Sequence, residues 1–205
     1  MRPYGVDMGR DDRVIDPEKI YHAVSCGNNE GPIAWDRIDR ASLRRELGAA
    51  ATRYEWEVFA WCVMTTHHHV VLRCPEGGFS DGFREINGNH SRRTNRRHGR
   101  MNHLFRNRPF SDEVASDAHL IAAMLYVVRN PVTAGICRNA GAWTDSGYRA
   151  TVGKELPPPW LAIDFVLPLF GRTPEEARRE FARLVHGGHL PVSDTGSEEP
   201  PALKP

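Results

Sequence analysis

The residues best suited to chemistry are three consecutive histidines, His67, His68 and His69, which are followed by the apolar residues 70–72. This segment is typical of a β-strand, and side chains on a strand alternate between its two faces. His67 and His69 therefore point the same way, and His68 points the other way. Two imidazoles on one face, two residues apart, can bind one divalent metal ion.

A tyrosine is the second candidate. Residues 118–130 are predicted to form a helix, and at 100° per residue Tyr126 and Asn130 fall one turn apart on the side opposite its apolar stripe. An isolated tyrosine is usually structural, because aromatic rings mostly pack in cores. Here it lies away from the residues expected to pack against the core: Ile121, Met124, Leu125 and Val128.

Arginine is concentrated in one part of the chain. Between residues 84 and 108 there are eight arginines and a single acid, Glu85. A solvated helix face is the ordinary explanation of one charge run, but this run has almost no compensating acid, which favours a nucleic-acid surface. The candidate DNA-binding residues are Arg92, Arg93, Arg96, Arg97, Arg100, Arg106 and Arg108.

Together these features match the cleavage of a DNA strand. Metal held by His67 and His69 would polarise an oxygen of the scissile phosphate, and the Tyr126 oxygen would attack phosphorus to form a phosphotyrosine. Asn130 is placed to offer its side-chain carbonyl to the same metal. The arginines would hold the flanking DNA backbone.

Composition is that of an ordinary globular chain. The 205 residues are 40% hydrophobic and 26% charged, with a net charge of +1, enough for one core and a small extension. We find no apolar run of the roughly 18 residues that span a bilayer and no apolar signal-peptide core. We therefore expect a cytoplasmic, nucleoid-associated protein with no membrane partner. Its four cysteines form no CxxC pair and are expected to be reduced.

The order of predicted elements indicates an α+β fold, in which an antiparallel sheet is flanked by helices. A proline at the first helical position, after Thr173, predicts a further helix in a small C-terminal extension. The preceding elements are a strand at 19–26, a helix at 36–54, a tight antiparallel hairpin of strands 55–64 and 67–74, a helix from residue 80, a strand or extended hairpin at 103–114, and a helix from Ser116 or Asp117 to Pro131.

Three units are expected along the chain. Residues 1–156 would form the main domain, and residues 157–188, after a proline-rich link, a helical extension. Residues 189–205, rich in Pro, Ser and Glu, have the composition of a disordered tail.

Several of these segments resemble the REP-associated tyrosine transposases, a branch of the single-tyrosine HUH superfamily. The resemblance runs from about residue 19 to 187, with the motifs in the same order throughout. The family strand motif M-P-N-H-x-H-L-L corresponds to residues 64–71, and its block N-R-R-x-G…H-L-F to residues 95–99 and 103–105. The nucleophile block Y-x-x-x-N-P-V-x-A-G corresponds to residues 126–135.

The resemblance implies a ferredoxin-like, HUH-type sandwich. It implies that His67 and His69 are the metal pair, Tyr126 the nucleophile and Asn130 a third ligand, with Mg²⁺ or Mn²⁺ as the cofactor. The implied activity is that of a DNA transposase, a site-specific single-strand endonuclease and strand transferase. Its partner would be single-stranded or hairpin DNA, and the oligomeric state would be monomer or homodimer.

Two other hypotheses remain open. Thr65 and Thr66 stand where the family has Pro-Asn, and His68 where it has a bulky apolar residue, which favours a domesticated nucleic-acid-binding protein without cleavage. His68 itself is expected to be a buried, hydrogen-bonded histidine. Alternatively, His67, His69 and either His98 or His103 would bind zinc in a metal hydrolase.

Overall fold

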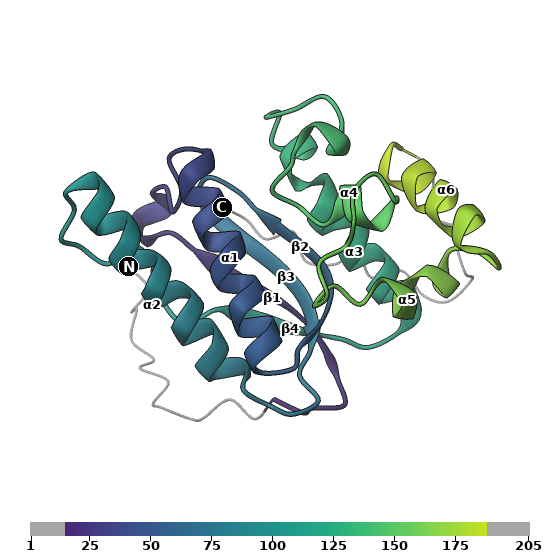
Figure 1. The fold of residues 1–205 in the computed structure, drawn as a ribbon, viewed down its shortest axis with the longest axis horizontal. Coiled ribbons are helices and arrows are strands. Elements are labelled where there is room, and N and C mark those ends of the chain that lie inside the picture. Colours follow the sequence, from purple (N-terminus) through teal and green to yellow (C-terminus); the bar gives the residue numbers. More distant parts are fainter. Residues whose placement is uncertain (1–14, 188–205) are drawn as a thin grey trace, which may run out of the picture.

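The computed structural model describes residues 15–187 of the chain. The predicted tail at 189–205 lies outside these residues. The α+β expectation is confirmed: an antiparallel sheet is flanked by helices, with small helices at the C-terminal end (Figure 1). The main elements are β1 (Ile20–Cys26), α1 (Arg37–Arg53), β2 (Glu57–Val63), β3 (His67–Arg73), α2 (Phe79–His98), β4 (Phe110–Val114), α3 (Asp117–Thr133), α4 (Tyr148–Thr151), α5 (Ile163–Val166) and α6 (Pro174–Val185).

The sheet has the order β2-β3-β1-β4, and every neighbouring pair is antiparallel. The hairpin predicted from residues 55–74 is therefore confirmed. Strand β1 lies in the middle, where Val24 is opposite His69 on β3 and His22 is opposite Asp112 on β4. Residues opposite each other in antiparallel strands share a face of the sheet, so this register decides which side chains of β1 meet the histidines.

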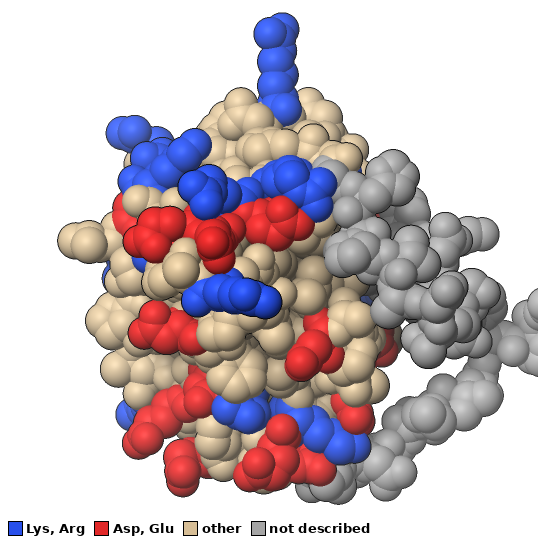
Figure 2. Space-filling view, turned by 90° about the vertical axis from the view of Figure 1, so that its right-hand side faces the viewer, with Lys and Arg blue, Asp and Glu red and all other residues tan. Residues whose placement is uncertain are grey.

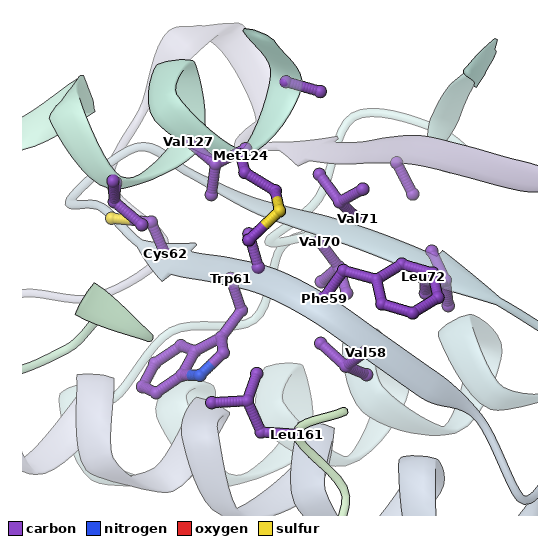
Figure 3. Packing of buried hydrophobic residues seen from close by; sticks show 14 of the residues in the cluster. Val58, Phe59, Trp61, Cys62, Val70, Val71, Leu72, Met124, Val127 and Leu161 are labelled. Carbon is purple, nitrogen blue, oxygen red and sulfur yellow. The ribbon is translucent and has the colours of Figure 1, made fainter. Parts of the chain in front are cut away.

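Helices α1 and α2 cover one face of the sheet, and α3 covers the other (Figure 1). Figure 3 shows Met124 and Val127 of α3 above the strands, with Trp61 of β2 pointing to the opposite side. Both interfaces are apolar, and the buried residues form one continuous cluster. A three-layer arrangement of this kind leaves two chemically separate faces on β3.

Helix α3 begins where the sequence predicted. The Ser116 side chain accepts a hydrogen bond from the His119 amide at 3.2 Å, which makes Ser116 the N-cap. The predicted end at Pro131 was wrong, because the helix continues to Thr133. A proline in the last turn removes one amide donor, and the Ala134 amide still closes the turn on the Asn130 carbonyl at 2.9 Å.

The segment before β4 also differs from prediction. We expected a strand or extended hairpin over 103–114, but only Phe110–Val114 forms a strand. Residues 99–109 run irregularly past the end of β1, where Phe105 forms an isolated bridge with Gly27 and the Asn28 amide donates to the Leu104 carbonyl. The apolar side chains there anchor a loop to the sheet.

The C-terminal part of the chain covers the outer edge of β2. Val58 forms a parallel bridge with Leu161, and Cys62 forms an antiparallel bridge with Ser146. The Ala162 amide donates to the Val58 carbonyl at 2.8 Å, and the Val63 amide to the Asp145 carbonyl at 2.8 Å. The predicted start of α6 is confirmed, with a complete capping box at Thr173 and Glu176. None of the helices between residues 15 and 187 is long and apolar enough to cross a bilayer.

Candidate active site

His67 and His69 lie on the face of β3 that α3 covers. His69 is only 2% exposed, whereas His67 at the start of the strand is half-buried. Their rings are perpendicular, with centroids 4.7 Å apart. The strand alternation expected from the sequence thus brings both imidazoles to one place.

Asn130 reaches both histidines from α3. Its Oδ1 atom lies 3.4 Å from Nε2 of His67, and its Nδ2 atom lies 3.2 Å from Nε2 of His69. An asparagine amide presents one oxygen and one NH₂ that can exchange places by a half-turn of the group. Two imidazole nitrogens and one amide oxygen therefore converge in the space between β3 and α3.

Tyr126 stands one helical turn before Asn130 on the same side of α3. Its side chain is 44% exposed, and its ring centroid is 5.6 Å from that of His69 with the planes perpendicular. The expected separation of Tyr126 from the apolar stripe is confirmed, although the stripe is wider than predicted. Ile121 is only half-buried. Because α3 packs against α6 as well as against the sheet, Leu120, Ala123 and Val127 are buried in addition to the predicted residues.

His22 is a residue of the site that the sequence did not single out. It lies on β1 with its Nε2 atom 3.0 Å from Nδ1 of His69, and its ring is stacked on that of His69 at 5.2 Å. Its centroid is 5.8 Å from that of Tyr126. A polar histidine among the apolar residues of a strand was the only available signal, because the pairing of β1 with β3 is not visible in one sequence.

Burial keeps these imidazoles uncharged at neutral pH. It lowers the pKa of His22 to about 4, with nearby His119 acting in the same direction. It also lowers the pKa of His67, although a hydrogen bond to Oδ1 of Asn130 acts in the opposite direction, and brings the pKa of His69 well below its usual value. A neutral imidazole has one nitrogen lone pair free, as metal binding requires.

His68 occupies the other face of β3, as expected. It is buried against α2, where its Nε2 atom is 3.1 Å from Oδ1 of Asn87, and Asn87 in turn donates to Ser25 at 3.0 Å. Burial lowers the pKa of His68 to about 4. The prediction of a buried, hydrogen-bonded histidine is confirmed.

The donor set suits a divalent ion whose remaining ligands come from elsewhere. Within residues 15–187 no three His, Cys, Asp or Glu side chains gather into a metal site. The protein would supply two imidazole nitrogens and the Asn130 oxygen, which leaves room for water and phosphate oxygens. His98 does not reach this place, because its Nε2 atom pairs with Asp39 Oδ2 at 2.8 Å on the α1–α2 side. His103 lines a groove along α2.

The seven candidate DNA-binding arginines differ in whether their side chains already have a partner within the protein. Arg97 is held by Asp36 at 2.6 Å and Asp39 at 2.7 Å, and Arg100 lies 4.9 Å over the Trp35 ring. Arg92 donates to Asn89, and Arg93 is 3.9 Å from Glu46. In the described part of the chain no ion pair is formed by Arg96, Arg106 or Arg108.

The position of the basic segment relative to the histidines follows from the fold. Helix α2 lies on the sheet face opposite α3, so its arginines are not beside Tyr126 (Figure 1). The segment after α2 passes the end of β1, where the Arg106 amide donates to the Cys26 carbonyl at 2.9 Å. Cys26 is opposite His67 in the sheet. Arg106 therefore lies at the edge of the histidine–tyrosine site.

A groove of about 290 Å³ separates α2 from residues 101–105. It is lined by the apolar Leu104 and Phe105 and by several amide and imidazole groups: Asn87, Asn95, Asn102 and His103.

The face formed by the C-terminal helices carries basic and acidic side chains in alternating bands (Figure 2). The pairs Arg183–Glu180 and Arg149–Glu155 belong to this region.

Comparisons with known proteins agree with this fold. Residues 17–130 match the family model described as "Transposase IS200 like". One similar solved structure is a REP-associated tyrosine transposase bound to a REP hairpin, with a TM-score of 0.59 and 20% identity over 77% of this chain and 89% of that one. At this identity the likeness shows the fold. No curated protein gives a significant match.

Proposed function

Because this chain belongs to the IS200-like transposase family, whose model matches residues 17–130, we propose that it cuts and rejoins single-stranded DNA through Tyr126. The family resemblance read from the motifs is confirmed by that match and by the fold of a REP-associated relative. The observation that carries the proposal is the placement of Tyr126 and Asn130, one turn apart on α3, against His67 and His69 on β3.

Each residue has a separate part in the proposed reaction. The Tyr126 oxygen attacks phosphorus, so that a tyrosine–phosphate bond forms while the bond to the leaving sugar oxygen breaks. The phenolic proton passes to solvent, and the leaving sugar oxygen takes up a proton from solvent to become a hydroxyl. The half-exposed position of Tyr126 gives a DNA strand access to this oxygen. Strand transfer is the reverse step, in which a sugar hydroxyl of a DNA end displaces the tyrosine.

A divalent ion, Mg²⁺ or Mn²⁺, held by His67, His69 and Asn130 would supply the positive charge that polarises the scissile phosphate. The lowered pKa values of the two histidines support this role, because protonated rings would repel the ion. The Asn130 amide lies 3.4 Å from Nε2 of His67 and 3.2 Å from Nε2 of His69, so its oxygen is within reach of the same ion.

Hairpin DNA is the proposed partner. The structurally similar transposase is bound to a REP hairpin. Arg106 forms no ion pair with residues 15–187 and lies at the edge of the site, where it is suited to a phosphate near the scissile bond. Arg96 on α2 and Arg108 before β4 would contact more distant phosphates. These contacts would make binding weaken steeply with salt.

The two departures from the family motif fit this fold without disturbing the site. The Thr66 hydroxyl lies 3.0 Å from Nδ1 of His67, and His68 has a hydrogen-bond partner on the opposite sheet face. Neither change removes a donor from the catalytic face. We therefore favour a cleaving enzyme over a nucleic-acid-binding protein that has lost cleavage, and over a zinc hydrolase that would need His98 or His103.

The test is the covalent adduct. The protein is incubated with end-labelled hairpin DNA and Mn²⁺, and we expect a labelled protein band that resists denaturing electrophoresis. Tyr126→Phe should abolish the band while retaining DNA affinity, and His69→Ala should reduce it at least 100-fold. Salt-dependent DNA binding with no adduct from the wild-type chain would favour the non-cleaving alternative. An adduct that persists in Tyr126→Phe would refute the nucleophile.

A further inference from the structure

His22 on β1 hydrogen-bonds to the buried ring of His69 on β3. Its Nε2 atom is 3.0 Å from Nδ1 of His69, and the two rings lie nearly parallel, at 28°. The other nitrogen of His69, Nε2, is the atom that faces Asn130 at 3.2 Å. Both nitrogens of the His69 ring therefore have a partner: Nδ1 contacts His22 on the side away from the metal position, and Nε2 contacts Asn130 at the metal position.

The direction of the hydrogen bond with His22 determines whether Nε2 of His69, the nitrogen that faces the metal position, has a free lone pair. A neutral imidazole carries one ring proton, so a lone pair on Nε2 of His69 requires the proton on Nδ1. That Nδ1–H can only donate, and Nε2 of His22 is the atom placed to accept it. In the opposite arrangement, His22 donates and the proton of His69 sits on Nε2, where it blocks an ion.

His22 is not placed to be a ligand itself. Its Nε2 atom faces the rear nitrogen of His69, whereas the Nε2 atoms of His67 and His69 face the Asn130 amide. His67 has a comparable rear partner in the Thr66 hydroxyl, 3.0 Å from its Nδ1. Each metal-facing imidazole is thus backed by a group that can accept a proton from Nδ1, which is how partners outside a metal site usually orient its histidines.

We propose that His22 is a positioning residue, which accepts the Nδ1 proton of His69 and so holds that ring with its Nε2 lone pair directed at the metal position. This inference rests on the proposed function for the identity of the ligand, a divalent cation. The hydrogen bond and its tautomer can be tested without DNA and without catalysis.

The experiment compares three chains: wild type, His22→Phe and His22→Gln. Phenylalanine keeps an aromatic ring against His69 but cannot accept a proton, whereas glutamine can place its amide oxygen near the position of Nε2. Histidine-selective ¹⁵N labelling and long-range ¹H–¹⁵N spectra of the metal-free chains report which nitrogen of His69 is protonated. Thermal melts confirm that each variant is folded.

We expect His69 to carry its proton on Nδ1 in the wild type and in His22→Gln, and to shift toward Nε2 protonation in His22→Phe. Mn²⁺ alone, titrated into each chain and followed by electron paramagnetic resonance, should bind about 10-fold more weakly to His22→Phe. Affinity in His22→Gln should stay within about 3-fold of the wild type, which a general packing role would not predict.

Wild-type His69 protonated on Nε2, or equal Mn²⁺ affinity in wild type and His22→Phe, would overturn the role of His22. Should His22→Phe fail to fold, the wild-type tautomer and the His22→Gln titration still decide the matter. The proposed function fails separately, if wild type forms no adduct with DNA although His69 has the expected tautomer and Mn²⁺ binds.

Discussion

At the scale of single residues, the three consecutive histidines have two different environments. His67 and His69 face α3 and the Asn130 amide, whereas His68 is enclosed by α2 on the other side of the sheet. His68 therefore acts on stability and not on the metal position. Its buried, uncharged ring makes folding sensitive to acid.

This sensitivity has a defined sign. Burial lowers the pKa of His68 from about 6.5 to about 4, so between these values the unfolded chain binds more protons, and stability falls as the pH drops below 6.5. We expect His68 to account for about 2 kcal/mol of the loss between pH 7 and pH 5. Urea unfolding at both pH values should show a smaller loss for His68→Leu than for the wild type.

The control for this prediction is a histidine at the surface. His103→Leu, at an exposed position in the groove along α2, should change the free energy of unfolding by less than about 0.5 kcal/mol. Desolvation also lowers the pKa of His22, His67, His69 and His90, which will keep part of the acid sensitivity in His68→Leu. Equal losses in His68→Leu and wild type would show that His68 is not held neutral.

The sequence alone could predict much of the histidine–tyrosine centre, because strand alternation and helical spacing are local. It could not predict His22. The contact of His22 with His69 depends on the pairing of β1 with β3, which join residues 47 positions apart. The contact between the Thr66 hydroxyl and Nδ1 of His67 joins adjacent residues, but it depends on the shape of the turn before β3, which the sequence does not specify.

At the scale of elements, helix α2 carries arginines that are ion-paired to the neighbouring helix and arginines that face solvent. Arg97 ties the end of α2 to the start of α1 through Asp36 and Asp39, and the Asp39 side chain is only 2% exposed. Arg96, the neighbour of Arg97, has no ion pair within residues 15–187. The run of arginines read from the sequence as one basic surface is therefore divided between helix packing and solvent.

We expect Arg97→Ala to lower the free energy of unfolding more than Arg96→Ala does, because it removes one of the partners of the buried Asp39 carboxylate. Arg96→Ala should change stability by less than about 0.5 kcal/mol, but should reduce the salt dependence of single-stranded DNA binding by roughly 0.7 in log–log slope. Urea melts and salt titrations of both variants measure these effects. Equal stability of the two variants would contradict the assignment of Arg97 to helix packing.

Two glycines of α2 provide a test of how that helix meets the sheet. A Cβ atom on Gly82 would lie 2.2 Å from the Trp56 ring, whereas the nearest atom to a Cβ on Gly88 is the Arg92 guanidinium at 3.5 Å. We expect Gly82→Ala to destabilise the fold by about 1–3 kcal/mol. Gly88→Ala should instead stabilise it by up to about 1 kcal/mol.

Thermal melts of Gly82→Ala and Gly88→Ala measure these opposite changes in stability. A stable Gly82→Ala chain would mean that Trp56 can move away from α2 at little cost. The sequence predicted helix α2, but it could not predict that the Trp56 ring packs against Gly82. This contact depends on how closely two segments far apart in the chain approach each other.

At the scale of the whole molecule, the C-terminal helices are joined to the main domain by buried contacts. Phe181 of α6 is fully buried and packs against Tyr148, whose hydroxyl is 2.9 Å from Nε2 of His186. The division between residues 1–156 and 157–188 remains a prediction about chain organisation. We expect both parts to unfold together.

Phe181→Ala should lower stability by about 3–5 kcal/mol and shift the whole thermal transition. Calorimetry is the appropriate measurement, because it separates one transition from two. If residues 157–188 instead unfold as an independent unit, the variant would split the melt and leave the main transition in place. Phe165→Ala, at a half-exposed position on α5, serves as the milder control.

The covering of β2 by residues 145–147 and 160–162 has a consequence for the protein during its synthesis. Strands β2 and β3 emerge from the ribosome well before the segments that bond to the outer edge of β2. Until those segments follow, the nascent chain presents an open, apolar strand edge of the kind that recruits other strands. A chain ending at residue 140 should therefore sediment as aggregate under conditions in which the full chain stays dispersed, because residues 145–147 and 160–162, translated after the β2–β3 hairpin, protect its open edge.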